Sequence, residues 1–127
     1  MAERLILVAD DEPHIRLLIE QSLEDLTDEE DVVLLTAADG QQALDTIRAR
    51  RPALVILDAM MPKMNGFDVC QAVKRELAMD DVFVILLTAK GQEYDRQRGE
   101  EVGADVYMTK PFDPDELLQR ARGVLGS

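Results

Sequence analysis

The sequence predicts an α/β fold in which helices cover both faces of a five-stranded parallel sheet. Three observations support this prediction. Short apolar segments alternate with longer amphipathic ones along the chain, as strands and helices alternate in βα units. The apolar segments lack polar alternation, which is typical of strands that are buried on both faces. The connections are short, so each helix should return over the sheet to the next parallel strand.

The first half of the chain is expected to form two βα units and a third strand. A strand over 4–9 is followed by a helix that begins at Pro13, because proline lacks the N–H group that the first helical turn leaves unpaired. Helical spacing predicts an apolar helix face made of Ile15, Leu18, Ile19, Leu23 and Leu26. A strand over 32–37, a turn at 39–40, a short helix and a strand over 54–57 follow.

The third βα unit is completed by a helix whose apolar face combines four residues. They are Phe67, Cys70, Val73 and Leu77. Cys70 is therefore expected to be a small core residue. The charged run Lys74-Arg75-Glu76 is expected to form the solvated face of this helix.

The last two βα units have a weak helix and a strong one. A strand over 82–87 precedes the mostly polar segment 91–102, whose thin apolar face predicts a helix that packs weakly. A short strand over 105–108 follows. The run Asp113-Pro114-Asp115-Glu116 then marks a helix start, with an N-cap, a proline at the first position and a glutamate three residues after the cap.

Length and composition limit the class of protein. At 127 residues, a single domain over 1–127 is expected. The net charge of −12 would repel the phosphate backbone of nucleic acids. One Cys and one His exclude an internal disulfide and an ordinary structural zinc site. No apolar run approaches the length of about 18 residues that spans a bilayer, and no secretory signal is present. We therefore expect a cytoplasmic domain that binds neither membranes nor nucleic acids directly.

Polar residues follow four of the predicted strands at the point where each strand ends. Asp10 and Asp11 follow the first strand and Asp58 the third, while Thr88 and Lys110 follow the fourth and fifth. The carboxyl ends of parallel strands share one edge of the sheet, where open α/β folds bind ligands. In the flavodoxin-like strand order 2-1-3-4-5, the first and third strands flank the switch point, so the three carboxylates should meet in one crevice.

These residue types together predict phosphoryl transfer. Carboxylates a few ångströms apart repel one another, and a divalent cation relieves that repulsion. Oxygen ligands suit Mg²⁺, which keeps water and phosphate oxygens among its ligands. Mn²⁺ could take its place. Lys110 adds a fixed positive charge and Thr88 a hydroxyl donor, both of which stabilise charge on a phosphoryl group. Asp58 is then expected to be the nucleophile that forms an acyl phosphate.

Four short motifs lie at these strand ends. They are Val8-Ala9-Asp10-Asp11-Glu12, Leu57-Asp58-Ala59-Met60-Met61-Pro62, Leu87-Thr88-Ala89 and Lys110-Pro111-Phe112. In this order the chain resembles, over essentially its whole length, the receiver domain of bacterial two-component response regulators. The resemblance implies a regulatory switch, not an enzyme, that accepts a phosphoryl group on Asp58. The donor would be the phosphohistidine of a histidine kinase or phosphotransfer protein, or a small molecule such as acetyl phosphate.

The resemblance also implies a role for each residue of the site. Asp11 and Asp58 would bind the metal, Asp10 would hold it mostly through water, and the backbone carbonyl of Met60 would complete the protein ligands. Lys110 would pair with a phosphoryl oxygen. The backbone N–H groups of Ala59 and Ala89 would face the same group, and the Lys110–Pro111 peptide would be cis.

The resemblance further implies how the signal leaves the site. Thr88 and the aromatic Tyr107 would act as the switch and shift the face formed by segment 91–102, strand 105–108 and the last helix. Some similar receivers dimerise through this face. Asp105-Val106 stands here where those receivers carry two acidic residues, so we expect a monomer or weak dimer through this face. The sequence does not name the downstream effector.

Two other classes are less consistent with these residues. A phosphatase of the haloacid dehalogenase type needs a general acid two residues after the nucleophile, where this chain has Met60. A flavodoxin needs Ser, Thr and Gly residues around the flavin phosphate, where this chain has Asp10-Asp11-Glu12. Turnover of an exogenous phosphoester, or yellow colour in the purified protein, would favour one of these classes.

Overall fold

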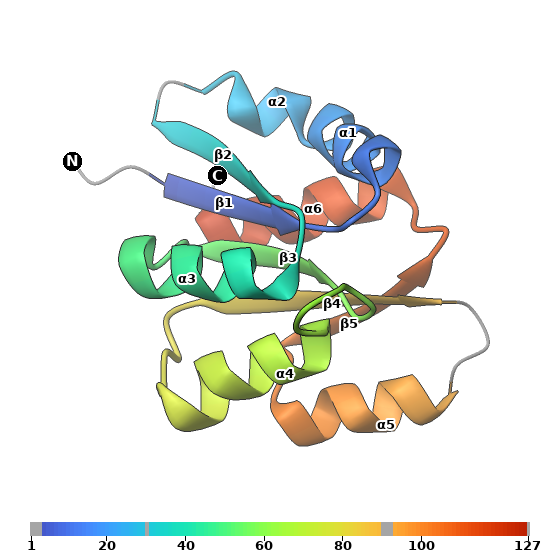
Figure 1. Ribbon diagram of the computed structural model, residues 1–127. Coiled ribbons are helices and arrows are strands. Elements are labelled where there is room, and N and C mark those ends of the chain that lie inside the picture. The colour runs from blue at the N-terminus through green and yellow to red at the C-terminus, as the bar shows by residue number, and fades with distance from the viewer. Residues whose placement is uncertain (1–3, 30, 90–92, 127) are drawn as a thin grey trace.

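The fold is a five-stranded parallel sheet between two layers of helices, as predicted (Figure 1). The computed structural model describes residues 4–29, 31–89 and 93–126. The strand order is β2-β1-β3-β4-β5, and every pair of neighbouring strands is parallel. The strands are β1 (Arg4–Ala9), β2 (Val32–Ala37), β3 (Leu54–Asp58), β4 (Phe83–Ala89) and β5 (Val106–Lys110).

The helices divide between the two faces of the sheet. They are α1 (Pro13–Ser22), α2 (Glu24–Thr27), α3 (Gly40–Arg50), α4 (Gly66–Gln71) with its π-helical continuation η1 (Ala72–Glu76), α5 (Glu93–Val102) and α6 (Pro114–Leu125). One face is covered by α1, α2 and α6, and the other by α3, α4, η1 and α5 (Figure 1). None of these helices is long and apolar enough to cross a membrane.

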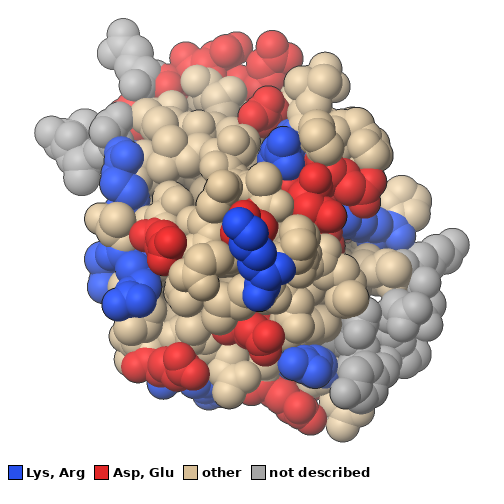
Figure 2. All heavy atoms as spheres, viewed as in Figure 1, with Lys and Arg blue, Asp and Glu red and all other residues tan. Residues whose placement is uncertain are grey.

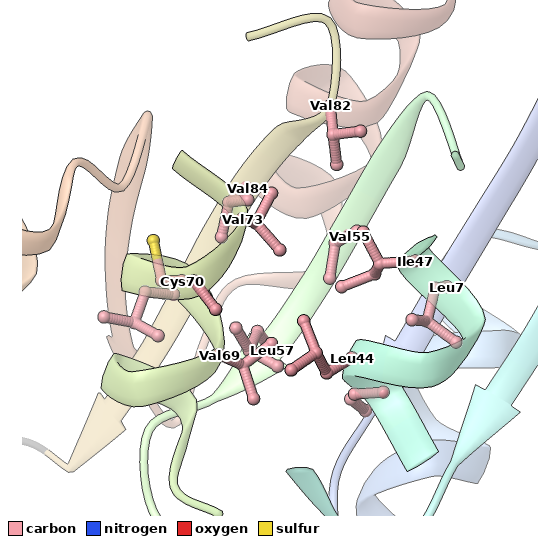
Figure 3. Close-up of a cluster of buried hydrophobic side chains, with 14 of the residues drawn as sticks. Leu7, Leu44, Ile47, Val55, Leu57, Val69, Cys70, Val73, Val82 and Val84 are labelled. Carbon is pink, nitrogen blue, oxygen red and sulfur yellow. The ribbon is translucent and has the colours of Figure 1, made fainter. Parts of the chain in front are cut away.

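Two hydrophobic cores lie on opposite faces of the sheet because side chains alternate along each strand. Leu7, Val55 and Leu57 point toward α3 and α4 and pack with Ile47 and Cys70 (Figure 3). The intervening strand residues point the other way, toward α1, α2 and α6; they include Ile6, Val8, Leu54, Ile56, Ile85 and Leu87. Burial on both faces explains the uninterrupted apolar runs in the sequence.

The first predicted helix divides at Leu23 into α1 and α2. Leu23 is buried, and its N–H group lies within hydrogen-bonding distance of the carbonyls of Ile19 and Glu20. The prediction that Leu18 belongs to the apolar face was wrong, because its side chain is 42% exposed. Ile15, Ile19 and Leu23 follow one another in steps of four and define the buried face, whereas Leu18 lies about 100° around the helix from Ile19.

The third predicted helix changes its winding after Gln71. The N–H group of Leu77 donates to the carbonyl of Ala72, five residues earlier, at 2.8 Å. This π turn rotates the following side chains, so Leu77 is exposed and Lys74 is turned inward. The predictions of a buried Leu77 and a solvated Lys74 were therefore wrong, whereas Arg75 and Glu76 are exposed as expected.

Lys74 is held by partners that are distant in the sequence. Its side chain is only 8% exposed, and its Nζ lies 2.7 Å from Asp105 Oδ2 and donates to the carbonyl of Val82 at 2.6 Å. Asp105 Oδ2 also accepts from the N–H group of Val84 at 2.8 Å. These bonds join η1 to the beginnings of β4 and β5.

The last helix begins as predicted. The Asp113 side chain accepts a hydrogen bond from the N–H group of Asp115, and Pro114 occupies the first helical position. The peptide between Lys110 and Pro111, which joins β5 to this turn, is cis, as predicted.

Candidate phosphoryl-transfer site

Asp10, Asp58 and Lys110 meet at the carboxyl edge of the sheet. Lys110 Nζ lies 3.0 Å from Asp10 Oδ2 and 3.2 Å from Asp58 Oδ1, although 100 residues separate Lys110 from Asp10. Both Asp residues are buried, at 0% and 5% exposure. Because β1 pairs with β3, the two carboxylates are brought to the same point, and Lys110 at the end of β5 reaches across to them.

Asp10 is fixed by three further hydrogen bonds. Its N–H group donates to the carbonyl of Ala37 on β2 at 3.1 Å. Its Oδ1 accepts from the N–H group of Glu12 at 2.9 Å, which turns the chain into α1. Arg16 then donates from Nη1 to the Asp10 carbonyl at 2.6 Å. The buried carboxylate therefore has a defined orientation.

Asp58 is positioned by the loop between β3 and α4. Its Oδ1 lies 3.3 Å from the N–H group of Met60, whose side chain is 68% exposed. The Ala59 N–H group, which was expected to face a phosphoryl group, instead donates to the carbonyl of Leu87 at 2.9 Å. That expectation was wrong because Ala59 continues the pairing with β4, so Met60 is the first loop residue with an N–H group directed at the Asp58 carboxylate.

The electrostatics of the site oppose ionisation of Asp58. Burial and, after it, the negative charge of Asp10 raise the pKa of Asp58 to about 6, against the opposing effect of Lys110. For Lys110, burial lowers the pKa, but its hydrogen bond to Asp10 and its attraction to both carboxylates outweigh burial, and the pKa is raised overall. Two buried carboxylates thus share one ammonium group, an arrangement that favours an additional cation.

An oxygen-rich cluster lies beside this pair. Carboxylate oxygens of Asp10, Asp11 and Glu12 lie within 4.8 Å of one another, with Asp10 buried and the other two exposed. This donor set suits a hard divalent cation such as Mg²⁺. Glu12 was not predicted as a ligand, although it follows Asp10-Asp11 directly in the sequence.

Thr88 and Tyr107 lie on neighbouring strands near this edge. The Thr88 hydroxyl is buried and has no hydrogen-bond partner among the residues that the structure describes. A buried hydroxyl without a partner is costly, so this group is available to an incoming acceptor. Tyr107 on β5 pairs with Leu86 on β4. Its side chain is half-buried and packs against the core on the α3–α4 face.

Comparison with known proteins identifies the family. The family model that describes the response regulator receiver domain matches residues 6–122 of this chain. The chain is 47% identical over 120 residues to "Probable transcriptional regulator ycf27" of Porphyra purpurea, covering 94% of this chain and 46% of that protein. It is 40% identical over 126 residues to the "DNA-binding dual master transcriptional regulator RpaA" of a Synechocystis strain, and this match covers 94% of this chain and 48% of that protein. This chain therefore spans about half the length of these curated relatives.

Solved structures agree with this assignment. The beryllofluoride-activated receiver domain of DrrB matches with a TM-score of 0.83 and 30% identity, over 98% of this chain and 99% of that one. Receiver domains are the phosphorylation-activated signalling domains of two-component systems, and their Mg²⁺ pocket is acidic, as the cluster at Asp10 is. By its sequence, its fold and its matched residues, the chain belongs to the response regulator receiver domain family.

Proposed function

We propose that Asp58 is the phosphoacceptor of this receiver domain. The observation that carries the proposal is the buried Asp58 carboxylate, 3.2 Å from Lys110 and beside Asp10. An oxygen of Asp58 attacks the phosphorus of the donor, and the bond from phosphorus to the donor's leaving group breaks. Lys110 pairs with a phosphoryl oxygen, and the Thr88 hydroxyl donates to another.

Mg²⁺ is the proposed cofactor. Asp11 and Asp58 would bind it directly, Asp10 mostly through water, and the Met60 carbonyl would complete the protein ligands. When bound, the ion neutralises charge on the transferring phosphoryl group. The oxygen-only donor set around Asp10 supports this choice.

The domain is proposed to act as a switch that catalyses only its own phosphorylation and dephosphorylation. Its phosphodonor would be a histidine kinase or a phosphotransfer protein in the cytoplasm. We further propose that residues 1–127 form one receiver domain that signals to an effector elsewhere. RpaA is named as DNA-binding, but the net charge of −12 supports a receiver portion that does not itself bind nucleic acid.

The test compares wild type, Asp58→Asn and Asp81→Asn after treatment with acetyl phosphate and Mg²⁺. Intact-mass measurement should find one phosphoryl group on wild type and on Asp81→Asn. Asp81 is a suitable control because its carboxylate is exposed and forms an ion pair with Arg51. Asp58→Asn should remain unlabelled because an amide is not a nucleophile of this kind. Equal labelling of Asp58→Asn would reject Asp58 as the acceptor.

A further inference from the structure

The N-terminal end of α3 lies directly against the loop between β3 and α4, residues 59–65 (Figure 1). Gly40, the first residue of α3, is buried at this contact. A Cβ atom at position 40 would lie 1.7 Å from the carbonyl oxygen and 2.5 Å from the carbonyl carbon of Met64. The obstacle is backbone, which cannot turn aside as a flexible side chain could. Position 40 therefore requires glycine for space.

Two polar contacts join the same segments. The Gly40 N–H group donates to the carbonyl of Pro62 at 3.4 Å. Lys63 Nζ lies 3.7 Å from Asp39 Oδ2, while Asp39 Oδ1 caps α3 by accepting from the N–H group of Gln42. The Asp39 side chain is only 9% exposed, whereas the Lys63 side chain is 70% exposed.

The other end of the loop is attached beside Asp58 itself. The Gly66 N–H group donates to the carbonyl of Ala59 at 2.8 Å. A Cβ atom at position 66 would lie 2.1 Å from the backbone oxygen of Asp58. Between these two attachments the loop presents Met60, whose N–H group faces the Asp58 carboxylate. The position of Met60 therefore depends on both contacts.

We propose that Gly40 is a positioning residue for phosphoryl transfer at Asp58; this inference rests on the proposed function. A side chain at position 40 must displace either α3 or the loop. Three buried side chains, those of Ala43, Leu44 and Ile47, anchor α3 in the core, whereas within residues 59–65 the larger side chain buried there is that of Met61, next to the exposed Met60. The loop therefore yields, and the N–H and carbonyl groups of Met60 move away from the reacting carboxylate.

The test measures phosphorylation rate and metal affinity in Gly40→Ala. Its matched control is Gly123→Ala, because nothing lies within 4 Å of a Cβ atom at that exposed position of α6. Each protein is titrated with Mg²⁺, and labelling by acetyl phosphate is followed by intact mass at a temperature where circular dichroism finds it folded. Gly40→Ala should react about tenfold more slowly at saturating donor and bind Mg²⁺ more weakly, since small displacements of catalytic geometry have large effects on rate. Gly123→Ala should match wild type.

A merely structural role would reduce the fraction of molecules that can be labelled without changing the rate constant. Unchanged rate and Mg²⁺ affinity in folded Gly40→Ala would overturn the inference. If Gly40→Ala does not fold, Asp39→Asn decides, because asparagine keeps the helix cap while removing the charge that faces Lys63. It should slow labelling about twofold to threefold, as expected for a weak ion pair, and a wild-type rate would overturn the inference. Failure of wild type itself to be labelled would instead contradict the proposed function.

Discussion

At the scale of single residues, Asp58 carries the clearest consequence of burial. Its pKa of about 6 lies above the value of about 3.9 for an unfolded Asp, because burial and the charge of Asp10 disfavour the carboxylate. Between pH 4 and pH 6 the folded protein therefore binds more protons than the unfolded chain. It follows that the free energy of unfolding of the metal-free protein decreases as pH rises through this window.

Asp58→Asn should remove this effect. In the presence of a chelator, the variant should exceed wild type in free energy of unfolding by on the order of 1–2 kcal/mol above pH 6, after allowance for solvent screening in the crevice. Below pH 4 the two proteins should be equally stable. Urea denaturation at several pH values measures the difference, and a difference that is independent of pH would contradict the assigned cause.

Cys70 is a titratable residue that lies in the hydrophobic core and outside the candidate site. Burial raises the pKa of its thiol to about 12, and its Sγ lies 3.6 Å from the carbonyl of Val102 inside the core. The thiolate is the reactive form, so Cys70 should not react with Ellman's reagent at pH 8 in the folded protein. Full reaction is expected after unfolding in guanidinium chloride. Rapid reaction of native protein would mean that the core at α4 opens readily.

At the scale of elements, the strands could be predicted closely and the helices less well. Each strand is buried on both faces, so its apolar run marks its position directly, and all five lie within two residues of the predicted bounds at either end. Helix faces depend on winding, which the sequence does not reveal locally. The π turn at Ala72–Glu76 reversed the expected exposure of Lys74 and Leu77.

The proximity of Asp10, Asp58 and Lys110 could be predicted for a related reason. In a parallel sheet of order 2-1-3-4-5, the carboxyl ends of β1 and β3 lie side by side, which brings Asp10 beside Asp58. The finer features depend on atomic geometry. Whether Ala59 or Met60 presents its N–H group to Asp58 is decided by one additional pairing with Leu87 on β4. The space required at Gly40 likewise depends on a contact with Met64, 24 positions away.

The Lys74–Asp105 pair should contribute clearly to stability, because it joins η1 to the residue that precedes β5. Asp105→Ala would leave a largely buried ammonium group and the N–H group of Val84 without their partner, so the free energy of unfolding should decrease by about 2–4 kcal/mol. Lys74→Met with Asp105→Leu should recover part of this loss by apolar packing.

The matched control is Asp81→Ala, which breaks the exposed ion pair with Arg51. That change should cost less than about 1 kcal/mol, because exposed pairs contribute little. Chemical denaturation measures all four proteins. Equal effects of Asp105→Ala and Asp81→Ala would mean that the inward position of Lys74 contributes nothing to stability.

At the scale of the whole molecule, the charged side chains on the surface affect whether two copies of the chain form a dimer. Acidic side chains form several separate groups on the face drawn in Figure 2, with basic ones scattered between them. Asp105 is already paired with Lys74 within the chain, so it is not free to pair across a dimer at the face made of α5, β5 and α6. We therefore expect light scattering to find a monomer or weak dimer without beryllofluoride, and a tight dimer in that state would contradict this prediction.

The face made of α5, β5 and α6 is also the proposed route by which the signal leaves the site. Thr88 has no hydrogen-bond partner for its hydroxyl within the described part of the chain, and a phosphoryl group on Asp58 would draw that hydroxyl toward it by a charge-assisted bond. Thr88 pairs with Thr109 on β5, two residues beyond Tyr107, so its movement changes the space beside that ring. Among the described residues, α5 contacts α4 and η1 partly through polar groups at the surface, including Arg98 over the Phe67 ring at 5.1 Å and Arg75 at the Glu101 carbonyl. An element held in this way can shift with little loss of stability.

Amide hydrogen exchange tests this route in wild type and Asp58→Asn, with Mg²⁺ present throughout and with or without beryllofluoride. Beryllofluoride stands in for the phosphoryl group, as in the activated DrrB receiver domain. In wild type it should change protection across residues 93–112, because α5 and β5 adjust to the new positions of Thr88 and Tyr107. Strands β1 and β2 lie at the other side of the sheet and should not change. Asp58→Asn should respond nowhere. If protection over 93–112 is the same with and without beryllofluoride while intact wild type binds it, the signal leaves the site by another face.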